Sequence, residues 1–339
     1  MKKILIFSLT LSLVACKAQQ PKDIEEANVM EYANTITPNE LQEHLYTFSS
    51  DEFEGREAGE PGQKKAAEYL KNEYRKLDIP SPLGQDDYYQ EVPESAFSRG
   101  NVKASENVLA YIKGSSMPEE VLVISSHYDH LGIGPEGNIF NGADDDGSGT
   151  VAILEIAEAF TKAIEDGYRP KRSILFLNNT GEEKGLIGSK WYTDHPVFPL
   201  AQTVANLNID MIGRVGEGKE NSGDYVYLIG SDKLSTDLHE LSEEMNSTYT
   251  NLELDYTFND ENDPNRFYYR SDHYNFAKHD IPVIFYFNGV HADYHQLTDT
   301  PDKINYELLA KRTKLVFLTA WEIANRDKRP FVNKPTLDK

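Results

Sequence analysis

Residues 121–125 read VLVIS, an apolar and β-branched run of the length expected for a buried strand. A helical pattern over residues 150–164 follows it along the chain. Similar strand patterns cover residues 108–112, 174–177, 204–209, 225–229 and 283–287, and further helical patterns cover 188–194, 232–246 and 305–323. Strands that alternate with helices predict a three-layer α/β fold, with a mostly parallel or mixed central sheet and helices on both faces.

The first residues have the pattern of a targeting segment. Lys2 and Lys3 precede an apolar run over residues 4–14, which is too short to span a bilayer as a stable helix. The run ends in LVAC at residues 13–16, which resembles the lipobox of bacterial lipoproteins, where the cysteine after the cleavage site is acylated. We therefore expect a signal peptide over 1–15 and a lipid anchor at Cys16. The expected location is the cell envelope, on the outer membrane or its periplasmic face.

The rest of the chain is predicted to form one domain. Residues 16–36 are polar and are predicted to be a tether, whereas Thr37-Pro38-Asn39-Glu40 is a capping box that predicts a helix start near residue 38. We expect a single domain over 37–327, with an N-terminal helical part at 37–100, a catalytic core at 101–327 and a C-terminal tail at 328–339.

The charge balance limits the classes of partner. With 56 acidic and 34 basic residues, the formal net charge is −22, so a nucleic-acid partner held through its phosphates is not expected. A protein that binds divalent cations fits this balance, although a solvated acidic surface explains it equally well. Cys16 is the only cysteine, so no disulfide can form within the chain.

Side chains that can bind metal follow several of the predicted strands, where open α/β sheets usually carry their sites. Five clusters contain them: His127 and Asp129; Asp144, Asp145 and Asp146; Glu182 and Glu183; Asp210; and His291 and His295. A carboxylate that interrupts an apolar strand end, such as Asp210, is costly to bury without a cation or a base. Taken singly, His127 with Asp129 is more typical of a surface histidine, and Glu182 with Glu183 could equally be a solvated helix start.

Two alternatives remain open at this point. The segment from Asp144 to Glu155 comes close to the spacing of an EF-hand calcium loop, but residues 131–141 are rich in Gly and Pro where an EF-hand needs an entering helix. Two histidines also compete with the preferred pair, because His130 follows His127 by three residues and His291 precedes His295 by four. Spacing alone does not choose among them.

The order of these clusters resembles the co-catalytic zinc aminopeptidases of peptidase family M28, from about residue 107 to 323. The resemblance implies that His127 and Asp210 bind one zinc ion, that Glu183 and His295 bind a second, and that Asp145 bridges the two. It also implies that Glu182 is the general base. The family pattern, rather than spacing, favours His127 and His295 as the ligands.

The resemblance also implies roles around the metals. Two zinc ions about 3.5–4 Å apart can share and activate a water, and Glu182 would take its proton. The Tyr294 hydroxyl is expected to stabilise the oxyanion, Asp129 to orient His127, and Asp299 to orient His295. Arg270 and Asp272 lie in a segment that resembles one beside the family's active site, where contact with the substrate and a purely structural role are equally open.

The expected function is therefore that of a hydrolase, a zinc-dependent exopeptidase acting on peptides, and within that class an aminopeptidase. A glutaminyl cyclase with a single zinc ion shares the fold and several ligands, so it is the nearest alternative. A metal-binding module without catalysis is another. The sequence contains no H-E-x-x-H motif, no G-x-S-x-G motif and no phosphate loop, which excludes those other hydrolase designs.

Overall fold

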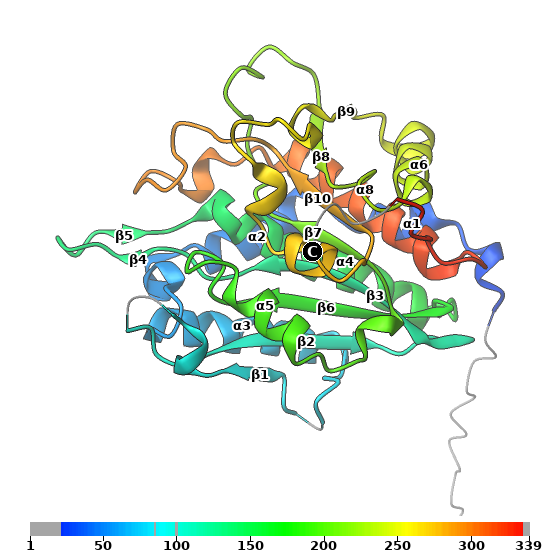
Figure 1. Ribbon diagram of the computed structural model, residues 1–339, viewed down its shortest axis with the longest axis horizontal. Coiled ribbons are helices and arrows are strands. Elements are labelled where there is room, and N and C mark those ends of the chain that lie inside the picture. The colour runs from blue at the N-terminus through cyan, green and yellow to red at the C-terminus, as the bar shows by residue number, and fades with distance from the viewer. Residues whose placement is uncertain (1–21, 85, 99–100, 335–339) are drawn as a thin grey trace, which may run out of the picture.

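The computed structural model describes residues 22–84, 86–98 and 101–334 (Figure 1). The predicted signal peptide and the Cys16 anchor lie outside these residues. Within the described ranges, no helix combines the length and the apolar character that crossing a bilayer requires.

A mixed sheet of eight strands forms the centre of the described part of the chain (Figure 1). Its order is β1-β2-β6-β3-β7-β10-β8-β9. The strands are β1 Tyr89–Val92, β2 Ser105–Ile112, β3 Met117–His127, β6 Arg172–Asn179, β7 Thr203–Ile209, β8 Tyr225–Ile229, β9 Glu253–Asp255 and β10 Val283–Phe287. The short strands β4 Gly132–Ile133 and β5 Ile139–Phe140 pair separately.

The middle of the sheet is parallel, and this positions the site. β3 pairs in parallel with β6 and β7, and β7 pairs in parallel with β10. The flanking pairs β1–β2, β2–β6 and β8–β10 are antiparallel. Because β6, β3, β7 and β10 run in the same direction, the loops that follow them emerge at one edge of the sheet.

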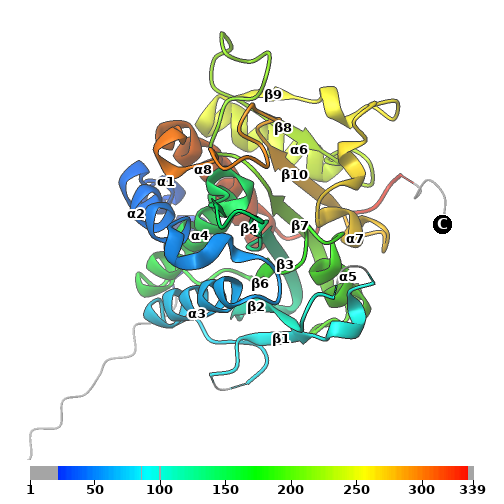
Figure 2. The same cartoon turned by 90° about the vertical axis from the view of Figure 1, so that its left-hand side faces the viewer.

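Helices cover both faces of the sheet, which confirms the predicted three layers (Figure 2). One face carries α1 Val29–Ala33, α2 Pro38–Phe48, α3 Pro61–Lys76, α4 Gly149–Glu165, α6 Thr236–Met245 and α8 Tyr306–Asn325; the other carries α5 Ile187–Asp194 and α7 His273–Ala277. Side chains of β3 alternate between the two cores: Leu122 and Ile124 join the first, while Val121 and Val123 join the second. Residues 121–124 of this strand are all apolar because both faces of the strand are buried there.

The N-terminal boundary differs in part from the prediction. The capping box is confirmed, because the Glu40 amide donates to the Thr37 hydroxyl at 3.2 Å at the start of α2. Residues 24–33, however, were assigned to the tether and instead pack on the domain: Ile24 and Tyr32 are buried, and the Tyr32 ring stacks on Trp321. These apolar side chains meet partners that are far away in sequence, so the packed part begins near residue 24 rather than 37.

Glu155 of α4 is a buried carboxyl group away from the strand ends. Burial, with smaller contributions from Glu40 and Glu158, raises the pKa of Glu155 to about 8. His44 Nε2 lies 3.7 Å away, but burial lowers the pKa of His44 and so favours its neutral form. The Glu155 carboxyl is therefore protonated in the folded protein at neutral pH.

We expect Glu155→Gln to stabilise the protein more at pH 8 than at pH 5. The unfolded chain loses the Glu155 proton near pH 4.5 and the folded chain only near pH 8, so the wild type loses stability as the pH rises between these values. An uncharged amide removes this loss, so the free energy of unfolding of the variant exceeds that of the wild type by up to about 4 kcal/mol at pH 8. Denaturant unfolding at both pH values measures it, with Glu158→Gln as the control. If the substitution changed the free energy of unfolding equally at the two pH values, Glu155 would not be protonated in the folded protein at neutral pH.

Candidate metal centre

The predicted metal-binding side chains meet at the carboxyl ends of the parallel strands. His127 is the last residue of β3, Asp210 directly follows β7, and Glu183 follows β6. His295 lies in the loop after β10, and Asp145 in the turn Ala143–Ser148 that precedes α4. Segments far apart in sequence therefore contribute to one site.

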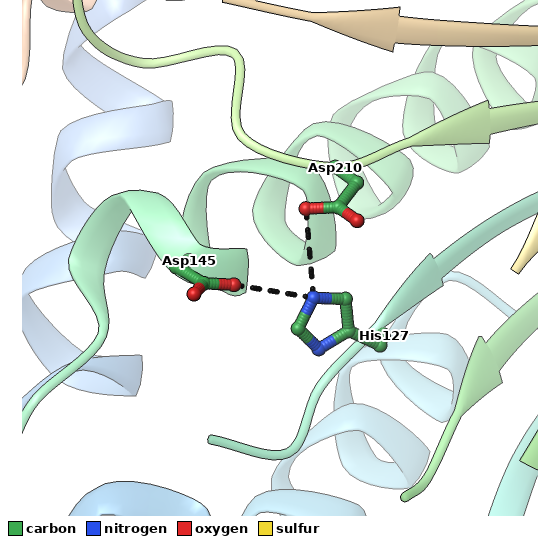
Figure 3. A group of neighbouring side chains, drawn as sticks. All are labelled: His127, Asp145 and Asp210. Atoms are coloured by element: carbon green, nitrogen blue, oxygen red, sulfur yellow. Dashed lines mark ion pairs between the residues drawn. The ribbon is translucent and has the colours of Figure 1, made fainter. Parts of the chain in front are cut away.

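The first group of converging atoms belongs to His127, Asp145 and Asp210 (Figure 3). His127 Nε2 lies 3.3 Å from Asp145 Oδ1 and 3.6 Å from Asp210 Oδ1. All three side chains are buried. Such a set of one imidazole nitrogen and two carboxylate oxygens suits a divalent metal such as zinc.

A second group converges on the other oxygen of Asp145. His295 Nε2 lies 3.0 Å from Asp145 Oδ2 and 3.1 Å from Glu183 Oε1. The Asp145 carboxylate therefore lies between two imidazoles, with one oxygen towards each. The structure brings together all five side chains that the sequence singled out as metal ligands.

The two competing histidines behave differently. His291 Nε2 lies 3.0 Å from Asp144 Oδ2, a carboxylate that belongs to neither group. His130 Nδ1, in contrast, lies 3.1 Å from Glu183 Oε1 and 3.7 Å from Asp145 Oδ2, within the second group. The sequence analysis preferred His127 to His130, whereas the structure brings both to the site.

Several of these buried atoms have no hydrogen-bond partner among the residues that the structure describes. They are His130 Nδ1, Asp145 Oδ2, Glu183 Oε1 and His295 Nε2. Native proteins rarely leave buried polar atoms unpaired, because each one costs free energy. Four such atoms that converge on one point fit a bound cation.

The pKa values show that the site favours positive charge. Burial alone would lower the pKa of His127, but the carboxylates of Asp210, Asp129 and Asp145 raise it well above its usual value. Burial likewise opposes the charged form of His295, yet Asp145 and Glu183 raise its pKa to about 10. Metal cations would satisfy the same excess of carboxylate charge that these protons satisfy.

The residues around the two groups differ in part from their predicted roles. Asp129 was expected to orient His127; its backbone oxygen is 3.1 Å from His127 Nδ1, but its Oδ1 is 3.7 Å away and accepts the Glu182 amide. Asp299 was expected to orient His295, and this prediction is wrong. Its carboxylate accepts the backbone amides of Asp144 and Asp145, each at 3.1 Å, and so fixes the turn that carries Asp145.

Sequence reasoning did not single out Ser271 as a supporting residue. Its hydroxyl donates to Asp210 Oδ2 at 2.6 Å and accepts from Asn208 Nδ2 at 2.8 Å. Ser271 thereby orients the second oxygen of a side chain in the first group. The only sequence signal was its place between Arg270 and Asp272 in the family-like segment.

A small pocket opens beside both groups, and two of the expected reactive side chains line it. Glu182 and Tyr294 form part of its wall. Burial, against the opposing charge of His127 and with further contributions from the carboxylates of Asp210 and Glu183, raises the pKa of Glu182 well above its usual value. The Tyr294 ring stacks on His295, with 3.9 Å between the ring centroids. The apolar part of the lining is formed by Met211, Phe267, Phe285, Phe287 and Val290.

The two candidate substrate contacts, Arg270 and Asp272, differ in their access to the pocket. Arg270 lines the pocket, and its Nη2 donates to the Tyr294 hydroxyl at 3.5 Å. Asp272 is fully buried, accepts a hydrogen bond from Asn179 Nδ2 and is not among the pocket-lining residues. The geometry therefore favours the structural role for Asp272 and leaves Arg270 within reach of a ligand.

Comparison with known proteins identifies the family. The model of peptidase family M28 matches residues 107–320, which is more than half of the chain. The vacuolar membrane protease of Saccharomyces cerevisiae is 32% identical over 190 residues, which cover 52% of this chain and 17% of that protein. The chain thus spans only a minor part of that curated relative.

Solved structures show the same fold. The LapA aminopeptidase of Legionella pneumophila has a TM-score of 0.69 at 21% identity and covers 91% of this chain and 78% of its own. A zinc aminopeptidase from Bacillus subtilis has a TM-score of 0.63 at 18% identity, and the match covers 84% of this chain and 95% of that one. The glutaminyl cyclase of Porphyromonas gingivalis has a TM-score of 0.65 at 16% identity, and the match covers 84% of this chain and 97% of that one. The strand order, the converging side chains and the sequence match together assign this chain to peptidase family M28.

Proposed function

We propose that the chain is a zinc-dependent exopeptidase with two metal positions, and that its mode of action is that of an aminopeptidase. The observation that carries the proposal is the Asp145 carboxylate, because its two oxygens face two separate groups of nitrogen and oxygen donors. Imidazole and carboxylate donors in a buried site suit zinc. The zinc aminopeptidase of Bacillus subtilis, which shares the fold, supports this choice of metal.

In this proposal His127 and Asp210 hold the first zinc ion, Glu183 and His295 hold the second, and Asp145 bridges them. Bound zinc would supply a Lewis acid beside the scissile carbonyl and would lower the pKa of a water molecule there. The remaining steps belong to side chains of the chain itself.

Glu182 acts as the general base. Its side chain lines the pocket beside His127 and Asp210 but belongs to neither converging group. It accepts the proton of the attacking water and later returns it to the departing amine. The Tyr294 hydroxyl, which lies in the same pocket wall, donates a hydrogen bond to the carbonyl oxygen as negative charge develops on it.

The pocket lining suits the amino end of a peptide. Its apolar residues can take an apolar first side chain, and the acidic lining of the pocket as a whole favours a free α-ammonium group. Arg270 lines the same pocket beside the Tyr294 hydroxyl, where its charge can meet a carbonyl or carboxylate of the substrate. The LapA aminopeptidase, which shares the fold, supports this mode.

One substrate panel tests the proposal. The purified chain is assayed with free peptides, the same peptides acetylated at the amino end, and glutaminyl peptides, each with a chelator and with added zinc. We expect zinc-dependent release of the first residue from free peptides and none from acetylated ones. Release of carboxyl-terminal residues would overturn the aminopeptidase mode.

The same panel separates the alternatives. The glutaminyl cyclase with the shared fold favours a second candidate, which would convert glutaminyl peptides to pyroglutamyl peptides with release of ammonia and would need one zinc ion. A metal-binding module would bind zinc and yield no product. The Cys16 anchor stays a prediction of the sequence, and mass spectrometry of the mature protein from its host would detect the acylated cysteine.

A further inference from the structure

We propose that His130 is a fourth protein ligand at the second metal position, together with Asp145, Glu183 and His295. This inference rests on the metal binding in the proposed function, but it adds a ligand that the five-residue pattern lacks. It makes the two metal positions chemically different.

Two imidazole nitrogens, from His130 and His295, lie close to the same two carboxylate oxygens, from Asp145 and Glu183. His295 Nε2 is 3.0 Å from Asp145 Oδ2 and 3.1 Å from Glu183 Oε1, and His130 Nδ1 is 3.7 Å and 3.1 Å from the same two oxygens. Nitrogen and oxygen ligands at about 2.0–2.1 Å from a tetrahedral zinc ion lie about 3.3 Å from one another. The four nitrogen–oxygen distances, between 3.0 and 3.7 Å, are close to this spacing, so both imidazoles lie at ligand distance from a cation held by the two carboxylates.

His130 differs from an ordinary buried histidine, whose ring nitrogens are usually held by hydrogen bonds. The side chain is fully buried, and within residues 22–84, 86–98 and 101–334 neither ring nitrogen has a hydrogen-bond partner. His273 is also buried without such a partner, but its ring stacks on Phe285, and burial lowers its pKa to about 3. Of these two histidines, only His130 directs a ring nitrogen at two carboxylate oxygens. This is the arrangement expected of a histidine that binds a cation together with those carboxylates.

The surrounding chain holds the His130 ring in this orientation. The buried Arg56 guanidinium donates to the backbone oxygens of Tyr128, Asn141 and Gly142, which lie on both sides of His130 in the sequence. The His130 amide in turn donates to the Arg56 oxygen. Gly142 has a φ of +54°, and a β-carbon there would lie 2.5 Å from His130 Cγ. The ring thus occupies space that only a glycine leaves open.

The two positions consequently have different ligand counts. His127, Asp145 and Asp210 give the first position three protein ligands and leave room for water or substrate, which is typical of catalytic zinc. Four protein ligands would fill the second position, which is typical of structural zinc. We therefore expect the second position to bind its metal more tightly, and the first to lose its metal first during dialysis against a chelator.

Cadmium-113 NMR of the full chain tests this directly. A metal bound through Nε2 couples to both carbon-bound ring protons of a histidine, whereas one bound through Nδ1 couples detectably only to Hε1. With two equivalents of cadmium-113, we expect both couplings from His127 and His295, and the Hε1 coupling alone from His130. This pattern identifies His130 in the wild type, so the test does not depend on a variant that folds.

A variant adds a second measurement. In competition with a zinc chelator, we expect His130→Gln to weaken the tighter site by more than about 100-fold, because a ligand contributes more than the outer residues whose loss costs 10–100-fold. His273→Phe is the matched control, since it replaces another buried imidazole and should keep the affinity of both sites.

Two bound cadmium ions with couplings from His127 and His295 only would overturn the inference and leave the proposed function intact. Unchanged zinc affinity in His130→Gln would overturn it as well. A wild-type chain that binds no metal, or that binds two ions and cleaves no peptide, would instead overturn the proposed function.

Discussion

Replacing Glu182 with Gln lowers kcat for peptide hydrolysis by about 10²–10⁴-fold, while the protein keeps its two zinc ions. An amide cannot accept the proton that the general base must take. Glu182 belongs to neither converging group, so its loss should leave the metal ligands in position. Steady-state kinetics and elemental analysis of the same sample measure the two effects.

Glu183→Gln is the matched control for this experiment. It makes the same chemical change one residue away, but Glu183 Oε1 lies within 3.1 Å of both His130 Nδ1 and His295 Nε2. We expect this variant to lose activity together with zinc, whereas Glu182→Gln loses activity alone. Normal turnover by Glu182→Gln would remove Glu182 from the mechanism.

Replacing Asp145 with Ala is expected to weaken zinc binding at both positions and to abolish peptide cleavage. Of the described side chains, only its carboxylate faces both groups, so a single substitution removes one ligand from each. We expect a loss of more than about 100-fold in affinity at each position, because even outer residues of metal sites contribute 10–100-fold. Zinc titration by calorimetry measures both sites.

Asp146→Asn is the control for the bridging role. Asp146 is equally buried, but its Oδ1 accepts the amides of Gly149 and Met211, which an asparagine oxygen can also accept. We expect two sites of near-normal affinity in this variant. Retention of one tight site in Asp145→Ala would show that the carboxylate serves a single metal.

Much of the fold could be predicted because the central strands are buried on both faces. Strands β8 and β10 have the predicted bounds, and the order of the clusters matches the loops that follow the parallel strands. The edge strands β1 and β9 were missed, since they contain four and three residues and lack a clear pattern. The packing of Ile24 and Tyr32 was missed because it depends on partners such as Trp321, which the local sequence does not reveal.

The site shows a similar division. The five residues taken from the family pattern come together, although their roles as ligands stay a prediction. His130 could not be chosen from spacing, because the direction of its ring depends on Arg56 and Gly142, which other segments supply. The burial of Asp272 was equally hidden, since the segment from Arg270 to Asp272 is compatible with both a substrate contact and a structural role.

The contact of Asp299 with the Asp144 and Asp145 amides has a consequence for biogenesis. The turn that presents the bridging carboxylate is held by a residue more than 150 positions further along the chain. A nascent polypeptide therefore cannot assemble either cation position until residue 299 has been synthesised and has folded back. If the chain is exported, as its first residues predict, and if it crosses the membrane unfolded, it would travel without zinc and acquire the metal only after translocation.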